Sequence, residues 1–153
     1  MLALLRQGVS PERLALSVAI GIVVGNIPIL GLSTLMCALI ALAFRLNLPA
    51  IQLANAAMAP TQLLLIIPFV RLGEWITGAP PQPLTVKAGL ALLARGAGRA
   101  VVVLWDSILH AGLAWSLVAP AAIFVIYRLL NPLFTRAAAN LSRRGAEPGP
   151  LAG

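Results

Sequence analysis

One uncharged run near the start of the chain limits its possible folds more than any other feature. Between Leu14 and Phe44 there is no Asp, Glu, Lys, Arg or His. As one straight helix this run would be about 46 Å long, whereas the hydrocarbon core of a bilayer is about 30 Å thick. The sequence GNIPILG occupies residues 25–31 at its middle. Because proline removes a backbone donor and glycine frees the backbone, we predict two half-helices with a break at Pro28.

Two further runs, residues 46–70 and 100–127, are also long and apolar, and only Asp106 and His110 interrupt the second. Each run exceeds the 18 or so apolar residues that indicate a bilayer segment. Hydrophobic residues make up 60% of the chain and charged residues only 10%, whereas soluble domains carry about 25% charged residues. This composition excludes an ordinary soluble enzyme and predicts an integral membrane protein.

A polar island lies inside the second run, around Pro60. Proline has no backbone N–H donor, and this is tolerated in the first turn of a helix, where an N–H group would have no helical partner. We therefore predict a second break at Pro60 and a kink at Pro68. Charged and aromatic residues near the end of the run predict contact with lipid headgroups; they are Arg71, Glu74 and Trp75.

The first half-helix has clear start signals in residues 10–12 (SPE), which supply an N-cap serine, a first-turn proline and an acidic residue at the positive end of the helix dipole. Beyond them Ser17, Gly21 and Gly25 recur every four residues. This spacing places three small residues on one helix face. It predicts close packing of a second helix there, as in the GxxxG pattern.

The expected fold is all-α: a small polytopic membrane protein forming a single membrane domain over residues 1–153. Its core is two broken-helix hairpins within residues 10–78, and the sequence leaves open whether these hairpins re-enter the membrane. Residues 100–130 predict a C-terminal membrane helix or hairpin. The Pro- and Gly-containing residues 145–153 predict a disordered tail.

Residues 84–99 separate these parts and carry Lys87, Arg95 and Arg99 on one helical stripe. This pattern predicts a basic interfacial helix, and a solvated connector is the alternative. The whole chain has a formal net charge of +7. Because the basic residues are scattered between apolar runs, we expect the bilayer and its anionic headgroups as partners and no nucleic acid.

Few residues are suited to chemistry. The sequence has no phosphate loop, HExxH motif or nucleophile elbow, and Cys37 is the only cysteine. We therefore expect no catalytic residues, no enzyme activity, no cofactor and no metal site. Asp106 and His110 are four residues apart, the spacing of a carboxylate that orients an imidazole, so they are a possible ionisable pair. The alternative is that both lie at the membrane surface, where charge costs little.

Polar residues gather at the two predicted breaks. Non-helical backbone at membrane depth must be buried in protein or line a cavity, so the breaks should meet or share a pocket. Matching broken helices also point to transporter-like sites, although packed hairpins need turns as well. The hypothesis is a substrate pocket formed by Asn26, Pro28, Ser33, Thr34, Asn55, Pro60, Thr61 and Gln62.

The chain resembles the bacterial membrane family called domain of unknown function 2062 over about residues 7–78, and more weakly beyond them. The resemblance rests on Ser10-Pro11, Leu14-Ala15, Ala19-Ile20-Gly21, Gly25, Pro28, Gly31, Thr34, Arg45, Asn47, Pro60-Thr61, Pro68 and Gly73. It implies a multi-pass protein of the bacterial inner (cytoplasmic) membrane, with related domains fused to glycosyltransferases. It also implies Gln, Asn and Tyr at three positions where this chain has less polar residues, namely Ser33, Ala59 and Phe69.

Two functions from different classes are compatible with these features. The first is a small transport or lipid-handling module for an amphiphilic or lipid-linked substrate. The second is a non-catalytic membrane adaptor that positions a partner, such as a glycosyltransferase or a second copy of the chain. Only the first function requires a substrate-sized cavity at the breaks.

Overall fold

The computed structural model describes residues 10–29, 31–80, 91, 94 and 105–146, with side chains described up to residue 143. Five helices form in these ranges, and no strand occurs within them. The helices are α2 (Pro11–Val24), α3 (Leu32–Ala43), α4 (Leu48–Ala57), α5 (Ala59–Thr77) and α8 (Trp105–Ala146). The protein is therefore all-helical across its described part.

The first run is broken where proline and glycine predict it. Helix α2 begins at the predicted cap, where the Ser10 side chain accepts a hydrogen bond from the Arg13 amide. It ends at Val24, and α3 begins only after Gly31, which has a φ of +85°. Pro28 is buried inside this interruption. The left-handed backbone at Gly31 favours glycine because side chains with a Cβ are strained there.

The turn between α3 and α4 is a Schellman motif. The amide of Leu46 donates to the Ala41 carbonyl (2.8 Å) and the amide of Arg45 to the Leu42 carbonyl (3.4 Å). The left-handed position of this motif usually holds glycine, but here it is Arg45, with a φ of +51°. Asn47 then caps α4 through its side chain, which accepts from the Ala50 amide at 2.8 Å.

Helices α4 and α5 are separated only by Met58 and meet at an angle of 64°. Pro60 lies in the first turn of α5, as the second predicted break requires. Helix α5 then continues through Pro68 and ends at Gly78, whose φ is +70°. The second uncharged run is therefore one bent pair of helices.

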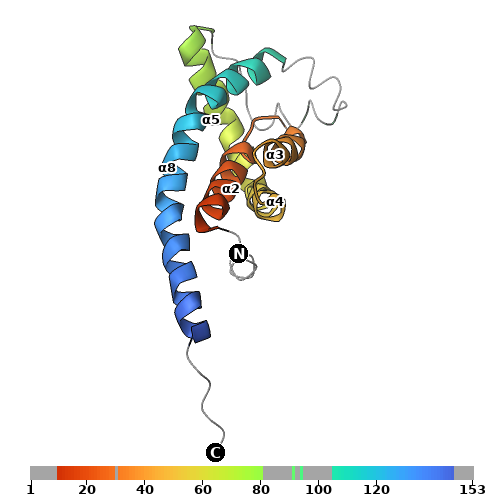
Figure 1. Cartoon of the computed structure of the whole chain (residues 1–153). Coiled ribbons are helices and arrows are strands. Elements are labelled where there is room, and N and C mark those ends of the chain that lie inside the picture. Colours follow the sequence, from red (N-terminus) through yellow and green to blue (C-terminus); the bar gives the residue numbers. More distant parts are fainter. Residues whose placement is uncertain (1–9, 30, 81–90, 92–93, 95–104, 147–153) are drawn as a thin grey trace, which may run out of the picture.

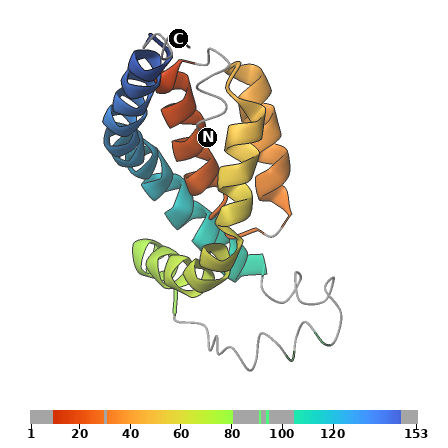
Figure 2. The ribbon, with the colours of Figure 1, turned by 90° about the horizontal axis from the view of Figure 1, so that it is seen from below.

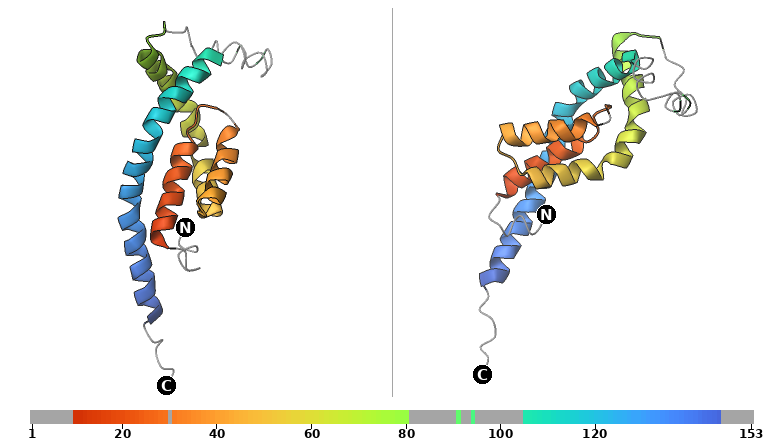
Figure 3. Two further views of the ribbon diagram at one scale, coloured as in Figure 1. Left: turned by 45° about the horizontal axis from the view of Figure 1, so that its top comes forward. Right: turned by 90° about the vertical axis from the view of Figure 1, so that its right-hand side faces the viewer.

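The helices α2, α3 and α4 lie side by side, and α8 runs along the outer side of α2 (Figures 1 and 2). Helix α5 leaves this layer and crosses the first part of α8 (Figure 3). The crossing is very close: a Cβ on Gly73 would overlap the backbone carbonyl of His110. The sequence predicts that Glu74 faces lipid headgroups, but it is buried at this crossing, with 4% of its surface exposed. Its carboxylate forms an ion pair with the Arg71 guanidinium at 2.9 Å.

The face of small residues on α2 contacts α4, as its spacing predicts. A Cβ on Gly21 would lie 2.7 Å from the Ala54 Cβ, closer than real Cβ contacts allow. Ser17 is fully buried, and its Oγ accepts a 3.0 Å hydrogen bond from the Asn47 amide. Helix α4 therefore packs directly against the α2 backbone. The apolar core on either side of this contact includes Leu14, Val18, Ile20, Val24, Cys37, Ala41, Ala50, Ile51 and Ala54.

Helix α8 has 42 residues and is a single helix rather than a hairpin. It is long and apolar enough to cross a membrane, and only 17% of its most apolar stretch is buried. The bent pair α4–α5 passes the same test as a unit. Helix α8 also includes residues 145 and 146, the first two of the predicted tail.

Two predicted segments lie largely or wholly outside the described residues. Within the predicted interfacial helix, residues 84–99, only Ala91 and Ala94 are described, and both are helical. Residues 147–153 of the predicted tail are not described.

Candidate functional site

The two breaks meet. The Gln62 side chain, in the first turn of α5, donates a buried 2.7 Å hydrogen bond from Nε2 to the Ile27 carbonyl in the first break. A Cβ on Gly25 would lie 3.0 Å from the Met58 Cβ, at the second break. The polar Gln62 therefore satisfies a carbonyl that lost its helical partner when α2 ended.

Other predicted pocket residues link α3 to α4. Asn55 Nδ2 donates to Thr34 Oγ1 at 3.3 Å, and Gln52 Nε2 donates to the Thr34 carbonyl at 3.0 Å. Asn55 and Ser33 are buried. These bonds fasten the start of α3 to α4, and the side chains that make them face protein partners.

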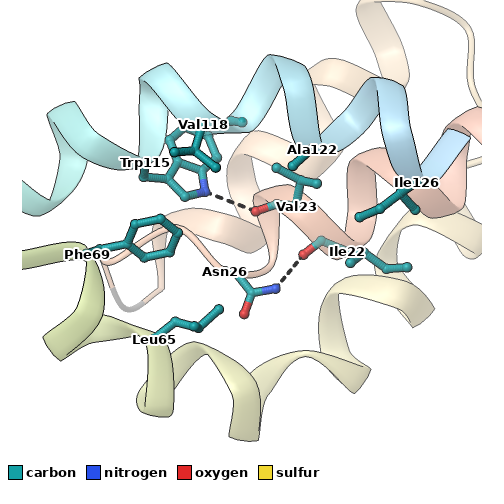
Figure 4. A pocket seen from close by; sticks show the side chains of 10 residues that line it. Ile22, Val23, Asn26, Leu65, Phe69, Trp115, Val118, Ala122 and Ile126 are labelled. Atoms are coloured by element: carbon teal, nitrogen blue, oxygen red, sulfur yellow. Dashed lines mark hydrogen bonds between the residues drawn. The ribbon is translucent and has the colours of Figure 1, made fainter. Parts of the chain in front are cut away.

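A cavity of about 230 Å³ lies on the other side of the first break, between α2, α5 and α8 (Figure 4). Its lining is apolar except for Asn26 and the ring nitrogen of Trp115. Most of the lining residues are partly exposed, so the cavity is open on one side. The lining residues are Ile22, Val23, Asn26, Leu65, Phe69, Trp115, Val118, Ala119, Ala122 and Ile126.

Two hydrogen bonds organise the polar groups of this cavity (Figure 4). Trp115 Nε1 donates to the Val23 carbonyl at 3.1 Å, and Asn26 Nδ2 donates to the Ile22 carbonyl at 2.7 Å. The second bond fixes the orientation of the amide, because the reverse orientation would place two oxygens together. Asn26 Oδ1 is buried, and no described residue donates a hydrogen bond to it.

The eight residues of the predicted substrate pocket therefore separate into different roles. Only Asn26 lines the cavity, whereas Gln62, Asn55 and Thr34 hydrogen-bond to other parts of the protein. Thr61 is half-buried and Pro60 is exposed in the first turn of α5. The apolar lining residues come from three helices, and no motif in the sequence distinguishes them from other apolar residues. Sequence analysis therefore did not identify them.

A comparison with protein-family models matches residues 1–140 to the family described as "Uncharacterized protein conserved in bacteria (DUF2062)". The chain belongs to this family. Neither the curated proteins nor the solved structures contain a match. The family resemblance expected from the sequence is therefore confirmed. The description of the family names no activity.

The three positions that depart from the family resemblance lie in different places. Phe69 lines the cavity, Ser33 is buried near the start of α3, and Ala59 is exposed at the first residue of α5. A tyrosine at position 69 would add a hydroxyl group to the cavity. With phenylalanine there, Asn26 carries the only side-chain oxygen among the ten described lining residues.

In the possible ionisable pair on α8, the imidazole of His110 contacts a backbone carbonyl and not the carboxylate. His110 Nδ1 lies 2.5 Å from the backbone carbonyl oxygen of Asp106, in the preceding helical turn. The Asp106 side chain is exposed. Within the described ranges no group of three His, Cys, Asp or Glu residues is placed to hold a metal ion.

Proposed function

We propose that this protein is a small multi-pass module of the bacterial inner membrane that handles or transports an amphiphilic lipid, and that it holds the apolar chain of that lipid in the cavity between α2, α5 and α8. The observation that carries the proposal is the apolar lining of this cavity, which is open on one side. A polar solute would find only one amide acceptor there, whereas an alkyl chain would replace exposed apolar surface with contacts.

The depth of the cavity along α8 supports this proposal. Trp105 and Arg128 mark the ends of a stretch of α8 in which Asp106 and His110, both near its start, are the only Asp, Glu, Lys, Arg or His residues between them. The Arg128 guanidinium lies over the Phe124 ring, 5.7 Å from its centroid. At 1.5 Å per residue, Trp115 lies about 15 Å from Trp105 and about 20 Å from Arg128 along the helix axis. If this stretch spans the bilayer core, the cavity lies near the membrane midplane, where acyl chains are found.

The lengths of the other helices support a re-entrant arrangement. Helices α2 and α3, with 14 and 12 residues, would extend only about 21 and 18 Å, too little to cross a core of about 30 Å. We infer that the α2–α3 hairpin enters and leaves on the cytoplasmic side. The bent pair α4–α5 and helix α8 then form two spans, with both ends of the chain in the cytoplasm.

Large exposed apolar side chains favour lipid around the whole helical body. They occur on α3, α5 and α8, among them Leu42, Leu64 and Leu129, each at least 64% exposed. Monomeric soluble proteins rarely expose apolar surface so widely. These side chains would face acyl chains, which leaves the cavity as the place where a single lipid chain is selected.

Photocrosslinking tests the proposal. The full chain is reconstituted with a bacterial phospholipid that carries a diazirine near the middle of one acyl chain, and adducts are mapped by mass spectrometry. We expect adducts concentrated on Phe69 and Trp115. The variant Ala122→Phe, which fills the cavity, should reduce them several-fold, whereas Ala121→Phe, at the exposed neighbouring position, should not.

A different outcome would favour the second function. Equal labelling of the cavity and of the outer residues Leu117 and Phe124, unaffected by Ala122→Phe, would mean that the cavity selects no lipid chain. The adaptor function, in which the helical body positions a partner protein, would then replace lipid handling.

A further inference from the structure

We propose that the ligand of this cavity carries an uncharged hydroxyl or protonated carboxyl group on its apolar chain, and that this group donates a hydrogen bond to Asn26 Oδ1. The inference rests on the proposed function, because it specifies the chemistry of the lipid chain. A buried acceptor without a donor is the observation that motivates it. Asn26 is 8% exposed and lines the cavity, and its Oδ1 lacks a donor among the described residues.

The direction of the Asn26 amide supports a ligand donor rather than a partner within the fold. Its Nδ2 is held by the Ile22 carbonyl at 2.7 Å, so Oδ1 faces the other way. Figure 4 shows the side chain of Asn26 extending toward α5, beside Leu65. The other polar group of the lining, Trp115 Nε1, already donates to the Val23 carbonyl. A buried acceptor left unpaired carries a desolvation penalty, which a donor from the ligand would remove.

The lining also determines the charge of the donor. No Asp, Glu, Lys, Arg or His is among the ten lining residues. A charged ammonium group would be transferred from water into an apolar cavity without a counter-ion, which is strongly unfavourable. An O–H group is uncharged and needs only one acceptor, so it fits both the lining and Asn26.

The size of the cavity limits the part of the ligand that it takes. An apolar cavity of about 150 Å³ holds benzene, so 230 Å³ corresponds to about nine non-hydrogen atoms. This is a short alkyl segment with its hydroxyl group, and the rest of a longer chain would leave through the open side. The shared chemistry, an O–H group on an alkyl chain, occurs in long-chain alcohols and in protonated fatty acids.

Tryptophan quenching tests this inference in the detergent-solubilised full chain. Replacing the exposed Trp75 and Trp105 with phenylalanine leaves Trp115, in the cavity, as the only tryptophan. Bromine quenches tryptophan fluorescence on contact. The probes are 6-bromohexan-1-ol and 1-bromoheptane, which have equal numbers of non-hydrogen atoms, and 6-bromohexanoic acid at low and neutral pH separates the acid from the alcohol.

The preference is the quenching constant of the bromoalcohol divided by that of the bromoalkane. Comparing this ratio between the single-tryptophan parent and Asn26→Leu cancels the different partitioning of the two probes into micelles. We expect the ratio to be about two- to tenfold higher in the parent, as for a neutral hydrogen bond. Asn131→Leu is the matched control, because Asn131 also has a buried Oδ1 without a donor in the described part of the chain but lies outside the cavity. This variant should keep the parent ratio.

A second variant keeps Asn26 in place. Phe69 and Asn26 line the same cavity (Figure 4), so Phe69→Tyr adds a hydroxyl group to the lining that can compete with the ligand for Oδ1 and should also lower the ratio. An equal ratio in the parent, Asn26→Leu and Phe69→Tyr would overturn this inference. If Ala122→Phe still abolished quenching by the bromoalkane, the proposed function would stand. If Ala122→Phe left quenching by both probes unchanged, both proposals would fail.

Discussion

At the scale of single residues, close backbone contacts hold the helices together. Gly21 and Gly73 lie where α2 meets α4 and where α5 meets α8, and a Cβ at either position would overlap a backbone carbonyl of the other helix. Such contacts leave no room for adjustment by side-chain rotation. The sequence pattern predicts the first of these contacts through three small residues at four-residue spacing, whereas Gly73 has only Thr77 at that spacing on its own helix.

We predict that Gly21→Ala destabilises the protein by about 1 to 3 kcal/mol, because the added Cβ would lie 2.4 Å from the Ile51 carbonyl oxygen. The matched control is Gly112→Ala in α8, where no atom of the described residues lies within 4 Å of the added Cβ. Alanine there should be neutral or stabilising by up to about 1 kcal/mol. Thermal unfolding in detergent measures both variants. Equal midpoints for the two variants would contradict close packing at Gly21.

A second prediction concerns the bond that joins the breaks. Gln62→Leu leaves the buried Ile27 carbonyl without its donor, which should cost about 1 to 3 kcal/mol of stability. Gln52→Leu is the control, because its bond to the Thr34 carbonyl is exposed and water can replace it. The thermal midpoint should fall clearly more for Gln62→Leu. If both midpoints fall equally, the Gln62 bond does not hold the junction together.

At the scale of elements, capping side chains and left-handed residues at the helix ends limit the lengths of the helices. Ser10 and Asn47 supply side-chain caps at the starts of α2 and α4, and left-handed backbone at Gly31 and Gly78 separates successive segments. Arg45 is the exception: a long charged residue holds the left-handed position of the Schellman motif. Backbone strain of this kind in a residue other than glycine costs about 1 to 2 kcal/mol.

We predict that Arg45→Gly stabilises the protein by about 1 kcal/mol and so raises its thermal midpoint, because glycine adopts a φ of +51° without strain. Arg45→Ala keeps the strain and removes the charge, so it should not raise the midpoint. Comparing the two variants in detergent separates the backbone effect from that of the guanidinium group. Stabilisation by both variants would indicate that charge, and not strain, is the unfavourable term.

At the scale of the whole molecule, one end of the helical body is basic. Leu130 and Phe134 of α8 pack against the core cluster that contains Leu14 and Val18 of α2, and the later part of α8 lies beside α2 (Figure 3). Arg45 belongs to the same end, because its turn is tied to α2 through the Asn47–Ser17 bond. In the proposed topology this end faces the cytoplasm, in agreement with the positive-inside tendency. The segments that form this end contain Arg13, Arg45, Arg128, Arg136, Arg143 and Arg144.

We therefore predict opposite locations for the basic end and for the end of α5. A phosphatase reporter that is active only outside the cytoplasm should be inactive when fused after Gly153 and active when inserted after Gly78. A cytoplasm-specific reporter at the same two positions should give the reverse pattern. Phosphatase activity at the C-terminus would overturn the proposed orientation, and equal results at both positions would mean that α8 does not cross the membrane.

Much of the helical layout could be predicted from the sequence, because it depends on local chemistry. A proline lacks a backbone N–H donor wherever it lies in the chain, so the breaks near Pro28 and Pro60 depend on short segments of sequence. The cap at Ser10 and the face of small residues at Ser17 and Gly21 are local in the same sense. Burial of Glu74 was not predictable, because it depends on how closely α5 crosses α8 at Gly73.

The candidate site was decided by tertiary structure. The sequence indicated that polar residues gather at the breaks, but it held no information on which of them would satisfy backbone groups and which would remain unpaired. Gln62 donates to the Ile27 carbonyl, while Asn26 lines a cavity and its Oδ1 has no donor among the described residues. That cavity exists because Phe69 and Trp115, far from Asn26 in the chain, come from two other helices. Apolar side chains look alike in a membrane sequence, so only their packing distinguishes a cavity wall from a lipid-facing surface.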